Sequence, residues 1–115
     1  MRARCRTACE ILARLPATLV PPGRCATFDS HWVVPIRAGD PARLAGALRA
    51  AGFDAAIASS LVALDPPADR PELDPVEARR LLAALVYLPA YPALPARARE
   101  RLVNALVGAD SAPAG

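Results

Sequence analysis

The 115-residue sequence predicts an α/β fold of the α+β two-layer kind. We expect a small sheet of two or three short strands with about four helices, mainly on one face. Apolar residues recur at helical three-and-four spacing in four segments, and short β-forming runs lie between them at 31–37, 53–58 and 85–88. Hydrophobic residues make up 54% of the chain and charged residues 22%, as is typical of a folded domain.

The first predicted helix covers residues 2–15. Its apolar stripe repeats at spacings of three and four residues and consists of Cys5, Ala8, Cys9, Leu12 and Leu15. Pro16 is expected to end the helix, and Pro21-Pro22-Gly23 to form a stiff turn. We therefore expect residues 1–24 to be an N-terminal helix and turn, followed by the main domain at 25–108.

Residues 31–37 predict the first strand, because they are rich in β-branched and aromatic side chains. Pro35 has no N–H to donate, which places this strand at an edge of the sheet. The next helix has clear boundary signals, since Asp40 can cap its free N–H groups and Pro41 suits its first position. Gly52 fits the left-handed position that ends a helix.

After this helix, residues 53–58 predict a second strand with Ile57 directed inward. Residues 64–75 hold four prolines and four acidic residues, a density that predicts a loop. Asp74 and Glu77 then have the spacing of a capping box at the start of a third helix.

The end of the chain predicts a strand at 85–88 and a last helix that begins near Pro95 and ends at Gly108. We expect the inner face of the third helix to consist of Ala78, Leu81, Leu82 and Leu85. The inner face of the fourth helix is expected to consist of Ala98, Leu102, Ala105 and Leu106. Residues 109–115 are expected to form a disordered tail.

The charge pattern excludes several classes of function. All 14 basic residues are Arg, so the chain has no lysine to form a Schiff base or to act as a base. The net charge of +3 resides in residues 1–14, and no aromatic residue lies among their arginines. We interpret them as a solvated helix face rather than a nucleic-acid site. No apolar segment predicts a signal peptide or a membrane span, so we expect a cytoplasmic protein.

Two groups of residues are of types that bind metals, but neither predicts a site. Cys5 and Cys9 share a helix face, yet no second cysteine pair and no histidine near them in sequence completes a tetrahedral set. We expect these two cysteines and Cys25 to be buried free thiols. The predicted loop at 64–75 carries four acidic residues, Asp65, Asp69, Glu72 and Asp74. A calcium-binding loop needs a glycine at its sharp turn and regularly alternating ligands, and this loop has neither.

The sequence predicts no catalytic or cofactor-binding residue. His31 has Asp29 and Ser30 beside it, but neighbouring strand residues point to opposite faces, so we interpret it as a polar residue at a strand start. Ser59 and Ser60 follow the second strand and could bind an anion; a simple strand-to-loop transition is the alternative interpretation.

Four segments, taken in order, are more specific than any of these residues. They are His31-Trp32-Val33-Val34-Pro35-Ile36, then Asp40-Pro41-Ala42-Arg43-Leu44, then Leu48-Arg49-Ala50-Ala51-Gly52-Phe53-Asp54, and last Val86-Tyr87-Leu88-Pro89-Ala90-Tyr91-Pro92-Ala93-Leu94-Pro95. Their order resembles the C-terminal small domain of fold-type I pyridoxal-phosphate (PLP) aminotransferases, and the DegT/StrS-type branch most of all. The resemblance covers about residues 28–107. It implies that the helix and turn at residues 1–24 are the linker helix between the large and small domains.

The resemblance implies a C-terminal domain or fragment of a transaminase that is not catalytic alone. PLP would be bound by a cofactor-binding large domain or partner subunit, and the complete enzyme could be a homodimer. Ser59 and Ser60 are the candidates for a substrate-side contact, and an apolar face would pack against the large domain. The alternative is a stand-alone, non-enzymatic α/β protein-interaction module. A small-ligand or nucleotide-binding domain has less support, because no phosphate-binding loop occurs.

Overall fold

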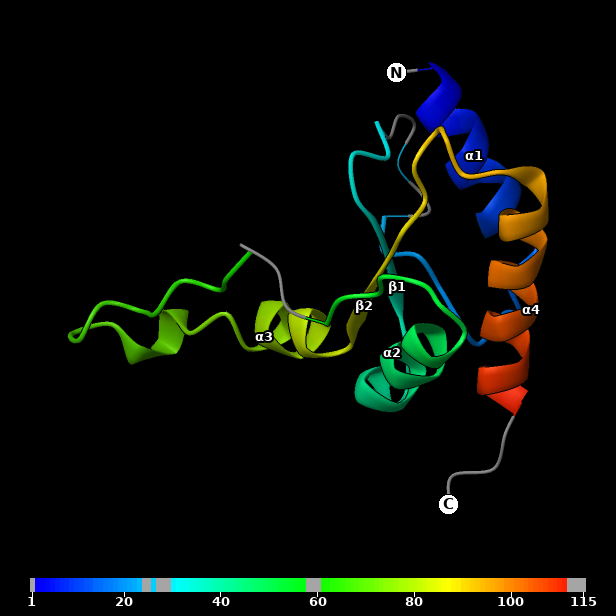
Figure 1. Ribbon diagram of the computed structural model, residues 1–115. Helices are drawn as coiled ribbons and strands as arrows, with labels where there is room; N and C mark the ends of the chain where they lie inside the picture. The colour runs from blue at the N-terminus through cyan, green and yellow to red at the C-terminus, as the bar shows by residue number, and fades with distance from the viewer. Residues whose placement is uncertain (1, 24–25, 27–29, 58–60, 112–115) are drawn as a thin grey trace.

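The described part of the chain folds as four α-helices and a two-stranded sheet, which confirms the predicted α+β class (Figure 1). The computed structural model describes residues 2–23, 26, 30–57 and 61–111. The elements in chain order are α1 (Arg2–Leu12), β1 (Val34–Arg37), α2 (Pro41–Ala50), the 3-10 helix η1 (Pro71–Leu73), α3 (Val76–Ala83), β2 (Leu85–Leu88) and α4 (Ala96–Ser111). No helix in these ranges is long and apolar enough to cross a membrane.

The sheet pairs β1 with β2 in antiparallel register, with Val34 opposite Leu88 and Arg37 opposite Leu85. Single bridges extend it on both sides, from Val20 to β1 and from Ala56 to β2. The predicted strand 53–58 is thus reduced, within its described residues, to one bridge.

Ile57 was expected to point inward, and this prediction is wrong. Its side chain is 43% exposed, because the chain leaves the sheet directly after the bridge between Ala56 and Tyr87. The backbone of Ala56 exchanges two hydrogen bonds with Tyr87, of 3.3 and 2.8 Å, and the ladder goes no further among the described residues.

One hydrophobic core joins the sheet to three helices. Its most deeply buried large side chains come from α1, β1, α2, β2 and α4, and are Ile11, Ile36, Leu48, Val86, Leu102 and Leu106. α2 packs against both β2 and α4. α3 contributes no buried residue, so it lies outside this core.

The predicted boundaries of α2 are confirmed. The Asp40 carboxylate accepts a hydrogen bond from the backbone N–H of Arg43 at 3.0 Å, and Pro41 is the first helical residue. Gly52 has φ +92°, a conformation that favours glycine. Arg101 of α4 closes the same end, since it donates to the carbonyl of Ala51 at 2.9 Å.

α1 begins at Arg2 and α4 at Ala96, as expected, but the ends of both helices differ from the predictions. α1 ends at Leu12, and α4 continues through Gly108 to Ser111, so the predicted stop at Gly108 is wrong. Ala109 packs against the core and its carbonyl accepts a hydrogen bond from Arg43. These contacts explain why the last turn forms despite the glycine. Of the predicted tail, residues 112–115 lie outside the described residues.

The expected cap of α3 is also wrong. Asp74 does not cap the helix; its carboxylate accepts from Arg79 Nε at 3.0 Å, and Pro75 holds the cap position without a side-chain bond. Arg79 also donates to Asp65 at 2.8 Å, so it ties the two ends of the predicted loop together. We call residues 61–75 the arm, because they project away from the core in Figure 1.

Candidate functional site

The two residues singled out for a substrate-side contact, Ser59 and Ser60, lie outside the described residues. The nearest described residue before them is Ile57, which is already exposed at the end of the sheet bridge. Their role therefore stays a prediction, and the described residues offer other places where chemistry or binding could occur.

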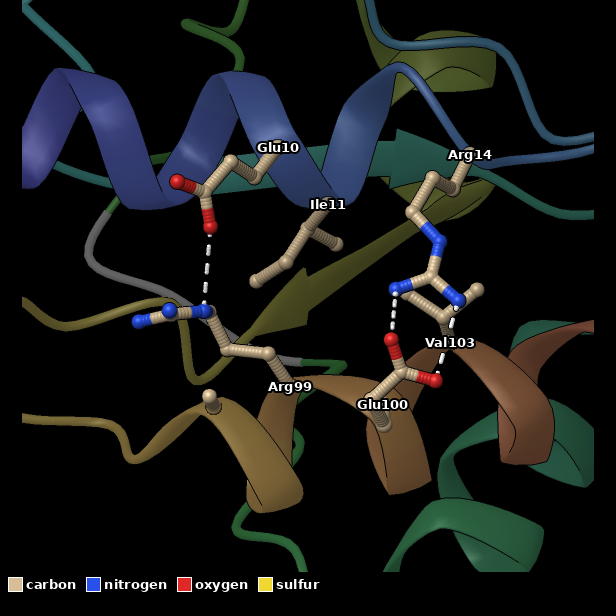
Figure 2. A pocket seen from close by; sticks show the side chains of 7 residues that line it. Glu10, Ile11, Arg14, Arg99, Glu100 and Val103 are labelled. Atoms are coloured by element: carbon tan, nitrogen blue, oxygen red, sulfur yellow. Dashed lines mark hydrogen bonds and ion pairs between the residues drawn. The ribbon is translucent and has the colours of Figure 1, made fainter.

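The first is a pocket of about 130 Å³ between α1 and α4 (Figure 2). Two ion pairs cross it. Arg14 forms a two-pronged pair with Glu100, with bonds of 2.9 and 3.3 Å, and Arg99 Nε lies 3.0 Å from Glu10. Ile11 and Val103 form its apolar lining between the pairs.

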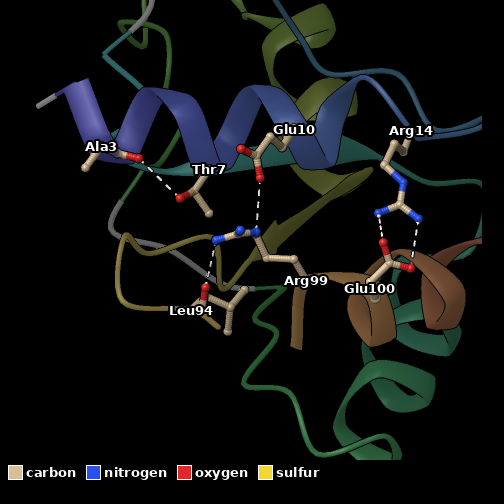
Figure 3. Close-up of polar contacts among 7 residues, drawn as sticks. All are labelled: Ala3, Thr7, Glu10, Arg14, Leu94, Arg99 and Glu100. Carbon is tan, nitrogen blue, oxygen red and sulfur yellow. Dashed lines mark hydrogen bonds and ion pairs between the residues drawn. The ribbon is translucent and has the colours of Figure 1, made fainter. Parts of the chain in front are cut away.

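Each charge in this pocket is matched by one of opposite sign. Figure 3 shows that Arg99 has a further acceptor, the carbonyl of Leu94 at 3.0 Å, while Thr7 bonds within its own helix to the carbonyl of Ala3. An anionic ligand would have to displace Glu10 or Glu100 from its arginine. The arrangement is therefore suited to holding α1 against α4 rather than to binding a charged substrate.

The second place is an apolar groove of about 290 Å³ beside the sheet. Trp32 and Tyr91 line it and are 74% and 53% exposed, an unusual degree for aromatic side chains. Arg4 also lines this groove, so one N-terminal arginine does lie next to aromatic residues in space, although none lies near it in sequence.

The arm and α3 form a second apolar surface. Its exposed large side chains are Leu61, Val62, Leu64, Leu73 and Val76. Arm charges are paired locally: Arg70 donates to Glu72 and thereby lowers the pKa of that carboxyl, and the bonds to Asp65 and Asp74 raise the pKa of Arg79. Exposed apolar surface of this extent is typical of a region that another protein or domain covers.

The third place is formed by two residues that the sequence did not connect. Cys9 Sγ lies 3.8 Å from His31 Nε2, although 22 residues separate them. The prediction of buried thiols is wrong for Cys9, which is exposed, and Cys5 is half-buried. Cys5 Sγ donates to the carbonyl of Ser30 at 3.6 Å.

His31 does not begin the strand as expected. It lies three residues before β1, with φ +50°. Cys25 and Asp29 lie outside the described residues. Among the described residues, no three His, Cys, Asp or Glu side chains gather in a group that could hold a metal ion.

Comparisons with known proteins identify a similar structure but no family. No family model matches this chain, and no curated protein matches it in sequence. The structure is similar to that of a DegT DnrJ EryC1 StrS aminotransferase from Brucella abortus, with a TM-score of 0.70 and 18% identity. The match covers 96% of this chain and 31% of that chain.

This likeness concerns the fold. The chain adopts the arrangement of a part of a DegT-type aminotransferase, and it spans about a third of that protein's length. At 18% identity the match does not carry over individual residues.

Proposed function

We propose that this chain is the C-terminal small domain, or a C-terminal fragment, of a PLP-dependent DegT/StrS-like aminotransferase. The observation that carries the proposal is the structural match over 96% of the chain, which agrees with the motif order at 31–36, 40–44, 48–54 and 86–95. In the complete enzyme an amino group would pass from an amino donor to a keto acceptor.

The residues of this chain do not fit PLP themselves. The cofactor is held through a lysine Schiff base in transaminases, and this sequence has no lysine. The charged groups of the α1–α4 pocket are engaged with one another and leave no free cation for a phosphate group. We therefore assign PLP to a cofactor-binding large domain or partner subunit.

What the chain would supply is a covering surface. The groove around Trp32 and Tyr91 and the exposed apolar side chains of the arm would pack against the cofactor-binding domain. Ser59 and Ser60 would then lie on the substrate side, as the resemblance implies. A homodimer of the complete enzyme and a cytoplasmic location belong to the same proposal.

Two measurements test this function. The DNA directly upstream is expected to encode, in frame or as a neighbouring gene, a domain with a lysine that binds PLP. When that domain is produced together with this chain, the two should copurify and show the absorbance of a lysine–PLP adduct that borohydride traps. Copurification without the adduct, or an unrelated neighbour, would contradict the proposal.

The alternative is a stand-alone interaction module, supported by one hydrophobic core that α1, α2, α4 and the sheet share. It predicts a monodisperse protein that remains soluble alone and captures a partner without a PLP site. An orphaned aminotransferase domain should instead aggregate through its exposed apolar side chains.

A further inference from the structure

We propose that Cys9 and His31 form a thiol-modification site, at which Cys9 forms a mixed disulfide with a small soluble disulfide and His31 accepts the thiol proton. The proposal does not depend on the aminotransferase assignment. Its main observation is the 3.8 Å contact between Cys9 Sγ and His31 Nε2, which is within reach of a sulfur hydrogen bond. A thiol next to an imidazole is the arrangement that activates cysteine as a nucleophile.

The surroundings of Cys9 leave it accessible to a reagent. Cys9 is exposed, so a small disulfide can reach it. Arg6 lies three residues earlier on α1 and brings positive charge to the same part of the helix. The neighbouring acid Glu10 is engaged by Arg99 at 3.0 Å, which offsets its repulsion of a thiolate. Exposed cysteines in electropositive surroundings are the ones that react.

Cys5 provides a natural comparison one helical turn away. It is half-buried, and its Sγ donates to the carbonyl of Ser30. A backbone carbonyl can accept a hydrogen bond but cannot act as the base of the reaction, so this contact does not activate Cys5. The chain segment at Ser30 and His31 thus contacts both cysteines of α1, but only His31 offers a base.

The reaction balances without any further reagent. The Cys9 S–H proton moves to His31 Nε2, and the sulfur attacks one sulfur of the small disulfide. A new S–S bond forms while the old one breaks, and the departing thiolate takes the proton from the imidazolium. Cys9 is oxidised, and the departing half of the disulfide is reduced to a thiol.

The test uses the whole chain with oxidised glutathione near neutral pH, followed by mass spectrometry. Cleavage after arginine places Cys9 in the peptide 7–14 and Cys25 in 25–37, so each is measured separately. We expect Cys9 to gain glutathione at least about tenfold faster in the native chain than in urea, where no folded contact remains. Equal rates in the two conditions would overturn the proposal.

Two variants separate the imidazole from general exposure. His31→Asn keeps a residue that tolerates the left-handed conformation at φ +50°, and should slow the reaction of Cys9 about tenfold. Cys5→Ser should leave the rate at Cys9 unchanged. An unchanged rate in H31N would show that exposure alone explains the modification and would refute the role of His31.

Discussion

Arg14, in the turn after α1, and Glu100 of α4 lie 86 residues apart in the sequence and meet in two parallel hydrogen bonds. The neighbouring pair of Glu10 and Arg99 crosses the same gap with the charges reversed. The segment made of α1 and the turn that follows it therefore presents one acid and one arginine to α4, and α4 presents one of each in return. This reversal fixes the relative register of the two helices, because sliding one helix along the other would bring like charges together.

The Arg14–Glu100 pair should contribute a small but measurable coupling energy. In a double-mutant cycle with Arg14→Ala and Glu100→Ala, we expect about 0.5 kcal/mol, because both side chains are substantially exposed. The measurement is urea unfolding at low salt, and the coupling should shrink in about 1 M salt. The control is the exposed pair of Arg80 and Glu77 within α3, which should show a smaller coupling energy. A coupling unaffected by salt would contradict this account.

Gly52 should be the glycine least tolerant of substitution in α2 and its boundary. With φ +92°, Gly52→Ala is expected to lower the free energy of unfolding by about 1–2 kcal/mol. Gly46 is the matched control, since it lies inside α2 with open space around its Cα; Gly46→Ala should raise stability by about 0.5–1 kcal/mol. Thermal unfolding of both variants measures the two changes in stability. If both substitutions changed the stability in the same direction, the special role of Gly52 would be contradicted.

Trp32 should matter for association rather than for stability. Trp32→Ala is expected to change the free energy of unfolding by less than about 0.5 kcal/mol, because the side chain is largely exposed. Light scattering should show slower aggregation of the isolated chain. The control is Ile36→Ala, at a fully buried position of β1, which should lower the free energy of unfolding by about 2–4 kcal/mol. A large loss of stability at Trp32 would show that it belongs to the core.

Glu72 should titrate below its ordinary pKa of 4.5, chiefly because its carboxylate accepts a hydrogen bond from Arg70. A lowered pKa in the folded state means that the interaction stabilises the fold above the unfolded-state pKa. It is lost as the pH falls through the folded-state value. NMR titration of the carboxyl should show the pKa rising toward 4.5 in Arg70→Gln. Identical titration in the two proteins would exclude Arg70 as the cause.

Local signals predicted the parts of the fold that local interactions determine. The boundaries of α2 follow from Asp40, Pro41 and Gly52, each of which acts on its own helix end. The end of α4 could not be predicted in this way, because Arg43 bonds to the carbonyl of Ala109 from 66 residues away. Asp74 failed as a cap for a related reason, since Arg79 competes for its carboxylate.

The candidate sites depended even more on long-range contacts. Neither the pairing of Arg14 with Glu100 nor that of Cys9 with His31 has a signature in sequence spacing, because the folded chain alone brings these residues together. The fold class was predictable, since apolar periodicity decides which segments become helices and strands. The apolar groove gave only a partial signal, in the aromatic residues Trp32 and Tyr91.

α3 has eight residues and no buried side chain, and this bears on how the domain moves. Helices this short have little stability of their own in water, so α3 should open far more often than the core helices. Its backbone amides should therefore exchange with deuterium well before those of Leu102 and Leu106. A protein that covers α3 would slow this exchange. Protection of α3 would then report the arrival of a partner, while the amides of α4 would change little.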